Sequence, residues 1–107
     1  MAKIYNKLVR DKIPEIIEKD GKILKIRILN DEEYKKELKN KLIEEANEAI
    51  LAENNADLSK EIGDILEVVE SIEKAFNLNK EEIIKLKKER KQNRGGFEKK
   101  IFLEEIE

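Results

Sequence analysis

Two long segments of this chain carry apolar residues at the spacing of one helix face, and a short polar connection at residues 54–57 joins them. The first segment begins at Asp31 and runs to about residue 53, and the second begins at Asp57 and runs to about residue 76. Their apolar residues recur three and four positions apart: Leu38, Leu42, Ala46, Ala49 and Ile50 in the first, and Leu58, Ile65, Val68, Val69 and Ile72 in the second. This pattern predicts two amphipathic helices, capped by Asp31 and Asp57, that pack as antiparallel neighbours.

Five acidic residues lie on these two predicted helices: Glu44, Glu45 and Glu48 on the first, and Glu61 and Asp64 on the second. Acids alone indicate little, because 45% of the residues are charged. Their positions indicate more. About six residues separate Glu48 from the end of the first helix, and about four separate Glu61 from the start of the second. At a rise of about 1.5 Å per residue, both groups are predicted at similar heights above the connection, where they can converge on one ion.

Glu61 falls inside the apolar arc of the second helix and Asp64 lies at its edge, and no Lys or Arg shares that arc between residues 61 and 73. A carboxylate directed toward a core must be paired, protonated or bound to a cation, so a metal ion is the simplest partner. The chain has no His and no Cys, which excludes thiolate and imidazole zinc sites, catalytic triads and Cys nucleophiles. Carboxylates alone suit Mg²⁺ or Mn²⁺ best, with Ca²⁺ as an alternative.

Gly63 lies between these two acids, in the middle of the predicted second helix. A glycine there costs up to about 1 kcal/mol relative to alanine. Its presence predicts that another group approaches the helix closely at this point.

Shorter elements are predicted at both ends of the chain. A short helix is expected between Asp11, as its cap, and Gly21, with Pro14 in its first turn. Alternating apolar residues predict a short strand at residues 23–29. A third long helix is expected at residues 80–92, from the capping-box pattern of Asn79 with Glu82 to the stop at Gly95-Gly96, and an extended tail from Phe97 to Ile106 is expected to pair with the strand. The expected fold is mainly all-α, an antiparallel helical bundle with a minor strand pair.

Length and charge set further limits. At 107 residues, one domain covering residues 1–107 is expected, with a modest core that a homodimer or higher homo-oligomer would share. The net charge of −2 gives no pull toward nucleic acid or an anionic membrane. No apolar run reaches membrane-spanning length and the N-terminus lacks a signal-peptide core, so a cytoplasmic protein is expected.

Four stretches of the sequence resemble a known family. Glu44-Glu45-Ala46-Asn47-Glu48, followed after twelve residues by Glu61-Ile62-Gly63-Asp64, is similar to the signature of the all-α nucleotide pyrophosphohydrolases, which include the MazG proteins, phosphoribosyl-ATP pyrophosphohydrolase and the dimeric dUTPases. The opening Tyr5-Asn6-Lys7-Leu8-Val9-Arg10-Asp11-Lys12-Ile13-Pro14 and the ending Lys91-Gln92-Asn93-Arg94-Gly95-Gly96-Phe97 resemble a narrower branch, the small phosphoribosyl-ATP pyrophosphohydrolase-like proteins. The histidine-pathway enzyme itself does not, as a rule, carry this opening, so the name of the branch need not name its substrate.

This resemblance implies an activity and a role for each candidate residue. The family's enzymes hold Mg²⁺ with the acids and cleave a nucleotide between the α- and β-phosphates, releasing pyrophosphate. The residues implied as metal ligands are Glu45, Glu48, Glu61 and Asp64. Glu44 would orient the attacking water or support the ligands from behind. The residues implied as phosphate contacts are Lys91 and Arg94, with Lys7 and Arg10 as weaker candidates.

Simpler interpretations remain open at this point. The acids can be a solvated helix face in a Lys- and Glu-rich protein. Lys91 and Arg94 can stabilise a helix C-terminus through its dipole, and Lys7 and Arg10 can be ordinary surface charges. The alternative function is a non-catalytic helical interaction module whose apolar face binds a partner helix.

Overall fold

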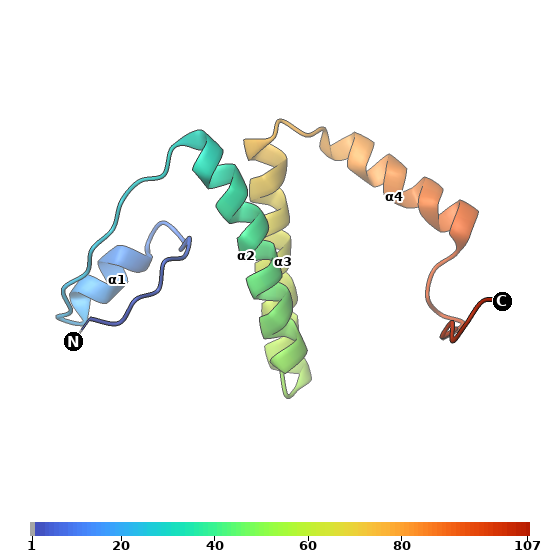
Figure 1. The fold of residues 1–107 in the computed structure, drawn as a ribbon, viewed down its shortest axis with the longest axis horizontal. Helices are drawn as coiled ribbons and strands as arrows, with labels where there is room; N and C mark the ends of the chain where they lie inside the picture. The colour runs from blue at the N-terminus through green and yellow to red at the C-terminus, as the bar shows by residue number, and fades with distance from the viewer. Residues whose placement is uncertain (1) are drawn as a thin grey trace. The chain divides into compact units, whose positions relative to one another are not determined.

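The computed structural model describes residues 2–107, and all regular secondary structure in that range is helical (Figure 1). The helices are α1 (Ile13–Lys19), α2 (Asp31–Leu51), α3 (Asn55–Ala75) and α4 (Lys80–Arg94). The mainly α class is therefore confirmed. The chain divides after Asn77 into two compact units, the first containing α1 to α3 and the second α4 and the C-terminal tail. A single domain over residues 1–107 stays a prediction.

Asparagine residues cap the two long helices of the first unit. The Asn30 side chain accepts a hydrogen bond from the backbone N–H of Glu33 at 2.9 Å, and the Glu33 side chain accepts one from the Asn30 backbone at 3.5 Å. Asn54 caps α3 by accepting from the backbone N–H of Asp57 at 2.8 Å. The predicted caps, Asp31 and Asp57, lie instead in the first helical turns. Their negative charge there is favourable, because a helix N-terminus carries partial positive charge.

The ends of the two remaining helices are also locally determined. Asn79 caps α4 as predicted, accepting from the backbone N–H of Glu82 at 3.0 Å. Helix α1 follows Lys12, whose side chain makes no capping hydrogen bond, so the predicted cap at Asp11 is wrong. Gly21 follows α1 with a φ of +77°, a conformation that favours glycine, and confirms the predicted stop.

Helices α2 and α3 pack side by side along their length and form the one extensive helix pair within residues 2–107 (Figure 1). Leu38 of α2 and Val68 of α3 are the buried apolar side chains of this pair. The ammonium groups of Lys35 and Lys39, early in α2, lie 5.4 and 5.0 Å from the ring centroid of Phe76, which follows the end of α3. The start of α2 therefore lies beside the end of α3, and the predicted antiparallel pair is confirmed.

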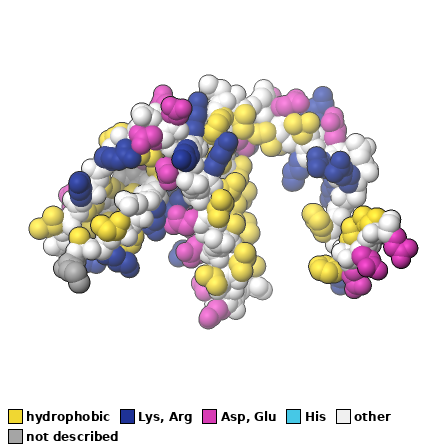
Figure 2. Space-filling view, in the orientation of Figure 1, with side chains coloured by type: hydrophobic (Ala, Val, Ile, Leu, Met, Phe, Trp, Pro, Cys, Tyr) yellow, Lys and Arg dark blue, Asp and Glu magenta, His cyan; other side chains and the backbone are white. Residues whose placement is uncertain are grey.

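Much of the apolar surface of this pair remains exposed. Figure 2 shows hydrophobic side chains distributed along α3. Ile62 is 45% exposed and Leu66 is 61% exposed, while Ile43 and Ile50 of α2 are 63% and 79% exposed. Leu38 and Val68 alone make a very small core. None of the described helices has a stretch long and apolar enough to cross a membrane.

The predicted strand pair is absent from the described residues. Residues 23–29 and the tail after Gly96 are irregular, and Ile26 and Ile28 are 58% and 89% exposed. A strand needs a neighbouring strand to accept and donate its backbone hydrogen bonds, and the tail that was expected to supply them belongs to the second unit. Arg27 instead forms an ion pair with Glu33 at 2.9 Å, which ties the segment to the first turn of α2.

Candidate metal centre

Three of the predicted ligands converge where α2 and α3 face each other. Glu45 of α2 and Glu61 and Asp64 of α3 each offer a carboxylate oxygen, and these oxygens lie within 4.8 Å of one another. All three residues are partly buried. The equal heights expected from sequence spacing are therefore confirmed for these residues. Two oxygens bound to one ion can be at most about 4.2 Å apart around Mg²⁺ and about 4.8 Å apart around Ca²⁺, from their usual bond lengths. Three oxygens that all bind one ion must lie closer together than this two-ligand limit, so the three carboxylates could share a divalent ion after a small side-chain movement.

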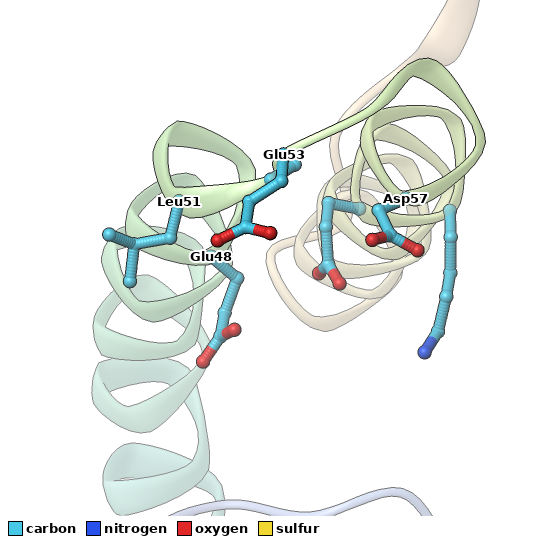
Figure 3. A pocket seen from close by; sticks show the side chains of 7 residues that line it. Glu48, Leu51, Glu53 and Asp57 are labelled. Carbon is cyan, nitrogen blue, oxygen red and sulfur yellow. The ribbon is translucent and has the colours of Figure 1, made fainter.

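Glu48 stands outside this group of three oxygens, although it was predicted as a ligand. Its side chain is exposed. It lines an open hollow of about 330 Å³ together with Glu61. Figure 3 shows Glu48 and Glu53 on one side of this hollow and Asp57 on the other. Glu48 is thus one helical turn from the converging carboxylates and lines a space that adjoins them.

Glu61 and Glu48 are the two candidate ligands that form no ion pair within residues 2–107, and Glu61 is the one of the two that belongs to the converging group. Partial burial raises the pKa of Glu61 above its usual value, and the negative charges of Asp64 and Glu48 raise the pKa further. A cation at this position would relieve both effects.

Glu44 has the opposite environment. Its Oε1 accepts hydrogen bonds from the ammonium groups of Lys7 and Lys41, each at 3.2 Å. Burial by itself would raise the pKa of Glu44, but the hydrogen bonds from the two lysines outweigh it and hold that pKa below its usual value. Glu44 is therefore a carboxylate held in its ionised form by the protein.

The opening motif reaches the acids, although it lies far away in the sequence. Lys7 binds Glu44, and the Arg10 guanidinium donates a hydrogen bond to Oδ1 of Asp64 at 2.9 Å. Asn6, just before Lys7, has a φ of +44°, which asparagine adopts more readily than most other residues. Lys7 and Arg10, the weaker of the predicted phosphate contacts, are thus the ones that lie beside the acids in the structure.

The stronger candidates, Lys91 and Arg94, lie in the second unit, in the last turn of α4. Both are exposed. The backbone N–H of Gly95 bonds to the carbonyl of Lys91 at 2.8 Å, so this is an ordinary helix end at which basic side chains are favourable.

One residue of the centre was not found from the sequence. Lys41 lies within ion-pairing distance of both Glu44, at 3.2 Å, and Glu45, at 3.5 Å. Its spacing of three and four residues from these acids is a signal that could have identified it. In a chain with 23 Lys and Arg residues, such spacings are also common by chance.

Comparisons of the chain with protein-family models, with curated proteins and with solved structures found no match.

Proposed function

We propose that the first unit is the metal-binding part of a nucleotide pyrophosphohydrolase that cleaves between the α- and β-phosphates, giving a nucleoside monophosphate and pyrophosphate. The observation that carries this proposal is the convergence of Glu45, Glu61 and Asp64 from two helices. The resemblance of the acid motifs to the all-α nucleotide pyrophosphohydrolases supplies the reaction class.

The charge of the centre supports a single divalent ion. The five acids carry five negative charges, and Lys7, Arg10 and Lys41 supply three positive charges beside them. Two negative charges remain uncompensated, which is the charge that one divalent cation neutralises. Mg²⁺ is the proposed ion and Mn²⁺ an acceptable substitute, because all the donors are carboxylate oxygens.

The residues divide the work of the reaction among them. Glu45, Glu61 and Asp64 would hold the ion, with Glu48 facing the adjoining hollow. When bound, Mg²⁺ would neutralise phosphate charge and lower the pKa of a bound water. Glu44, already ionised, would accept the proton of the attacking water. Lys7 and Arg10, which pair with Glu44 and Asp64, are the proposed phosphate contacts of this unit. The phosphate role implied for Lys91 and Arg94 in the second unit stays a prediction.

A homodimer or higher homo-oligomer forms part of the proposal. Contiguous exposed apolar surface on a soluble protein commonly marks an interface, and the exposed side chains of α2 and α3 supply such a surface. The same observation favours the second candidate function, a non-catalytic module whose apolar face binds a partner helix.

The two functions can be separated with Glu61→Gln. Thermal unfolding should be recorded with and without Mg²⁺, and the products of each common NTP and dNTP should be identified by phosphate NMR. For the enzyme, Mg²⁺ should raise the Tm of the wild type by ligand linkage and pyrophosphate should be the first product. Glu61→Gln should lose both effects and should be at least as stable as the wild type without metal. Near-normal Mg²⁺-dependent turnover by this variant would contradict the proposal.

A further inference from the structure

Lys41 is the least exposed charged partner of the acids. Its side chain is 15% exposed, whereas that of Lys7 is 42% exposed and that of Arg10 is 58% exposed. Lysine is rarely so enclosed without a partner. Its ammonium lies 3.2 Å from Oε1 of Glu44 and 3.5 Å from Oε1 of Glu45. It therefore links a residue of the proposed metal centre to the proposed base.

Two features distinguish this contact from an ordinary surface ion pair. First, Lys7 and Lys41 both bind the same oxygen, Oε1 of Glu44, which brings two positive charges together against their repulsion. Second, a lysine preceding its glutamate by four residues is the less favourable order for helix stability. The Lys41–Glu45 pair thus contributes less to helix stability than the reverse order would, while the contacts of Lys41 and Lys7 fix the position of the Glu44 carboxylate.

The two oxygens of Glu44 consequently differ. Oε1 is occupied by both lysines, whereas Oε2 receives no hydrogen bond from residues 2–107. The proposed ligands Glu45 and Asp64 each have one cation beside them, whereas Glu44 has two. The approach of a metal ion is therefore electrostatically least favourable at Glu44. A neutral water at Oε2 meets no such barrier.

We propose that Lys41, assisted by Lys7, is a positioning residue that excludes Glu44 from the metal and reserves its free oxygen for the attacking water. This inference rests on the function proposed above. It divides the neighbouring glutamates of α2 between two roles: Glu45 faces α3 and the ion, and Glu44 is held aside as the base.

Removal of the Lys41 charge should change metal affinity and turnover in opposite directions. A positive charge about 6 Å from a divalent ion in a water-like medium weakens binding on the order of tenfold, so Lys41→Met should bind Mn²⁺ more tightly by about that factor. Glu44, released toward the ion, should no longer orient water, and kcat should fall roughly 10- to 100-fold with a smaller change in KM. A purely structural lysine would not produce this pair of opposite changes.

The experiment uses the full chain and Mn²⁺ alone as the binding probe, with affinity measured from free Mn²⁺ by electron paramagnetic resonance. Lys41→Met keeps the apolar part of the side chain, Lys41→Arg restores the charge, and Lys7→Gln alters the more exposed partner. Lys74→Met is the matched control, because Lys74 is 77% exposed and forms an ion pair four residues away with Glu70 at 3.5 Å. Metal-free Tm values show whether each variant is folded.

The inference is supported if Lys41→Met binds Mn²⁺ more tightly and has a lower kcat than the wild type. Lys7→Gln should then show a smaller change of the same kind, and Lys41→Arg should bind Mn²⁺ with the affinity of the wild type. Unchanged affinity, or parallel losses of affinity and turnover in folded Lys41→Met, would overturn it while the proposed metal centre stands. An absence of Mn²⁺ binding by the wild type would overturn the proposed function as well. If Lys41→Met does not fold, the sign of the Lys7→Gln change decides.

Discussion

Gly63→Ala should stabilise this protein, although the residue lies between two acids of the candidate centre. Gly63 is within α3 and its backbone is not in the left-handed region. A Cβ placed there would meet nothing within 4 Å. The close approach of another group that its presence in the sequence predicts is therefore absent from the described structure. Replacement of Gly63 by alanine should therefore remove the free-energy cost of a glycine in a helix interior.

The expected gain is the difference in helix propensity between alanine and glycine, about 0.8–1.0 kcal/mol. For a domain of about this size, that corresponds to a Tm increase of roughly 4–8 °C. Thermal unfolding should be followed by circular dichroism without metal, with urea unfolding as a second measurement. Gly21→Ala is the matched control in the same unit. Its Cβ also meets open space, but its φ of +77° is unfavourable for alanine, so this variant should lose roughly 1–2 kcal/mol.

The open environment of Gly63 would be refuted if the Tm of Gly63→Ala were equal to or lower than that of the wild type while Gly21→Ala lost stability as expected. The dependence on protein concentration would then locate the missing neighbour. If stabilisation appears only in dilute protein, a second copy of the chain approaches α3 at Gly63. If it is missing at every concentration, the neighbour belongs to the same chain.

Two further predictions concern assembly and pH. Sedimentation equilibrium at micromolar concentration should show a dimer or larger species, because Ile43, Ile62 and Leu66 are exposed; a monomer alone would contradict the shared core. Without metal, the pKa of Glu61 is higher in the folded protein than in the unfolded chain, so the folded state holds this proton more tightly. Glu61 should therefore lower the free energy of unfolding as pH rises above the usual pKa of a glutamate. Urea unfolding of the wild type and of Glu61→Gln should therefore be compared from pH 4 to pH 7. The midpoint of the wild type should decrease relative to that of the variant as pH increases, and an increase would contradict the assigned environment.

The central helix pair was predictable because its signals are local and repeated. Apolar spacing determines the face of each helix, and a short connection determines that the helices are antiparallel. Those two facts place Glu45 opposite Glu61 and Asp64. The helix starts were displaced because an asparagine lies just before or near each predicted aspartate, and composition does not decide which of two good capping residues is used.

The remaining features depend on contacts between distant residues. Nothing near Lys7 or Arg10 in the sequence shows that they bind Glu44 and Asp64, which are 37 and 54 positions away. The strand expected at residues 23–29 requires a partner strand, and periodicity alone cannot supply one. Lys41 was missed for a different reason: charged residues are so common in this chain that one more local Lys–Glu spacing carries little information.

The distribution of cations over the acids is itself an argument for function. Glu44, Glu45 and Asp64 each have a lysine or arginine within 3.5 Å, whereas Glu48 and Glu61 have none among residues 2–107, and of these two only Glu61 belongs to the converging group. Glu61 nevertheless lies within the apolar arc of α3, where glutamine or an apolar residue would make the metal-free protein more stable. A residue that lowers the stability of the metal-free fold in this way is best explained by what it binds. Glu48 and Glu61 supply the two negative charges that remain, Glu61 within the converging group marks the point at which an ion would neutralise them, and Glu61→Gln tests that point directly.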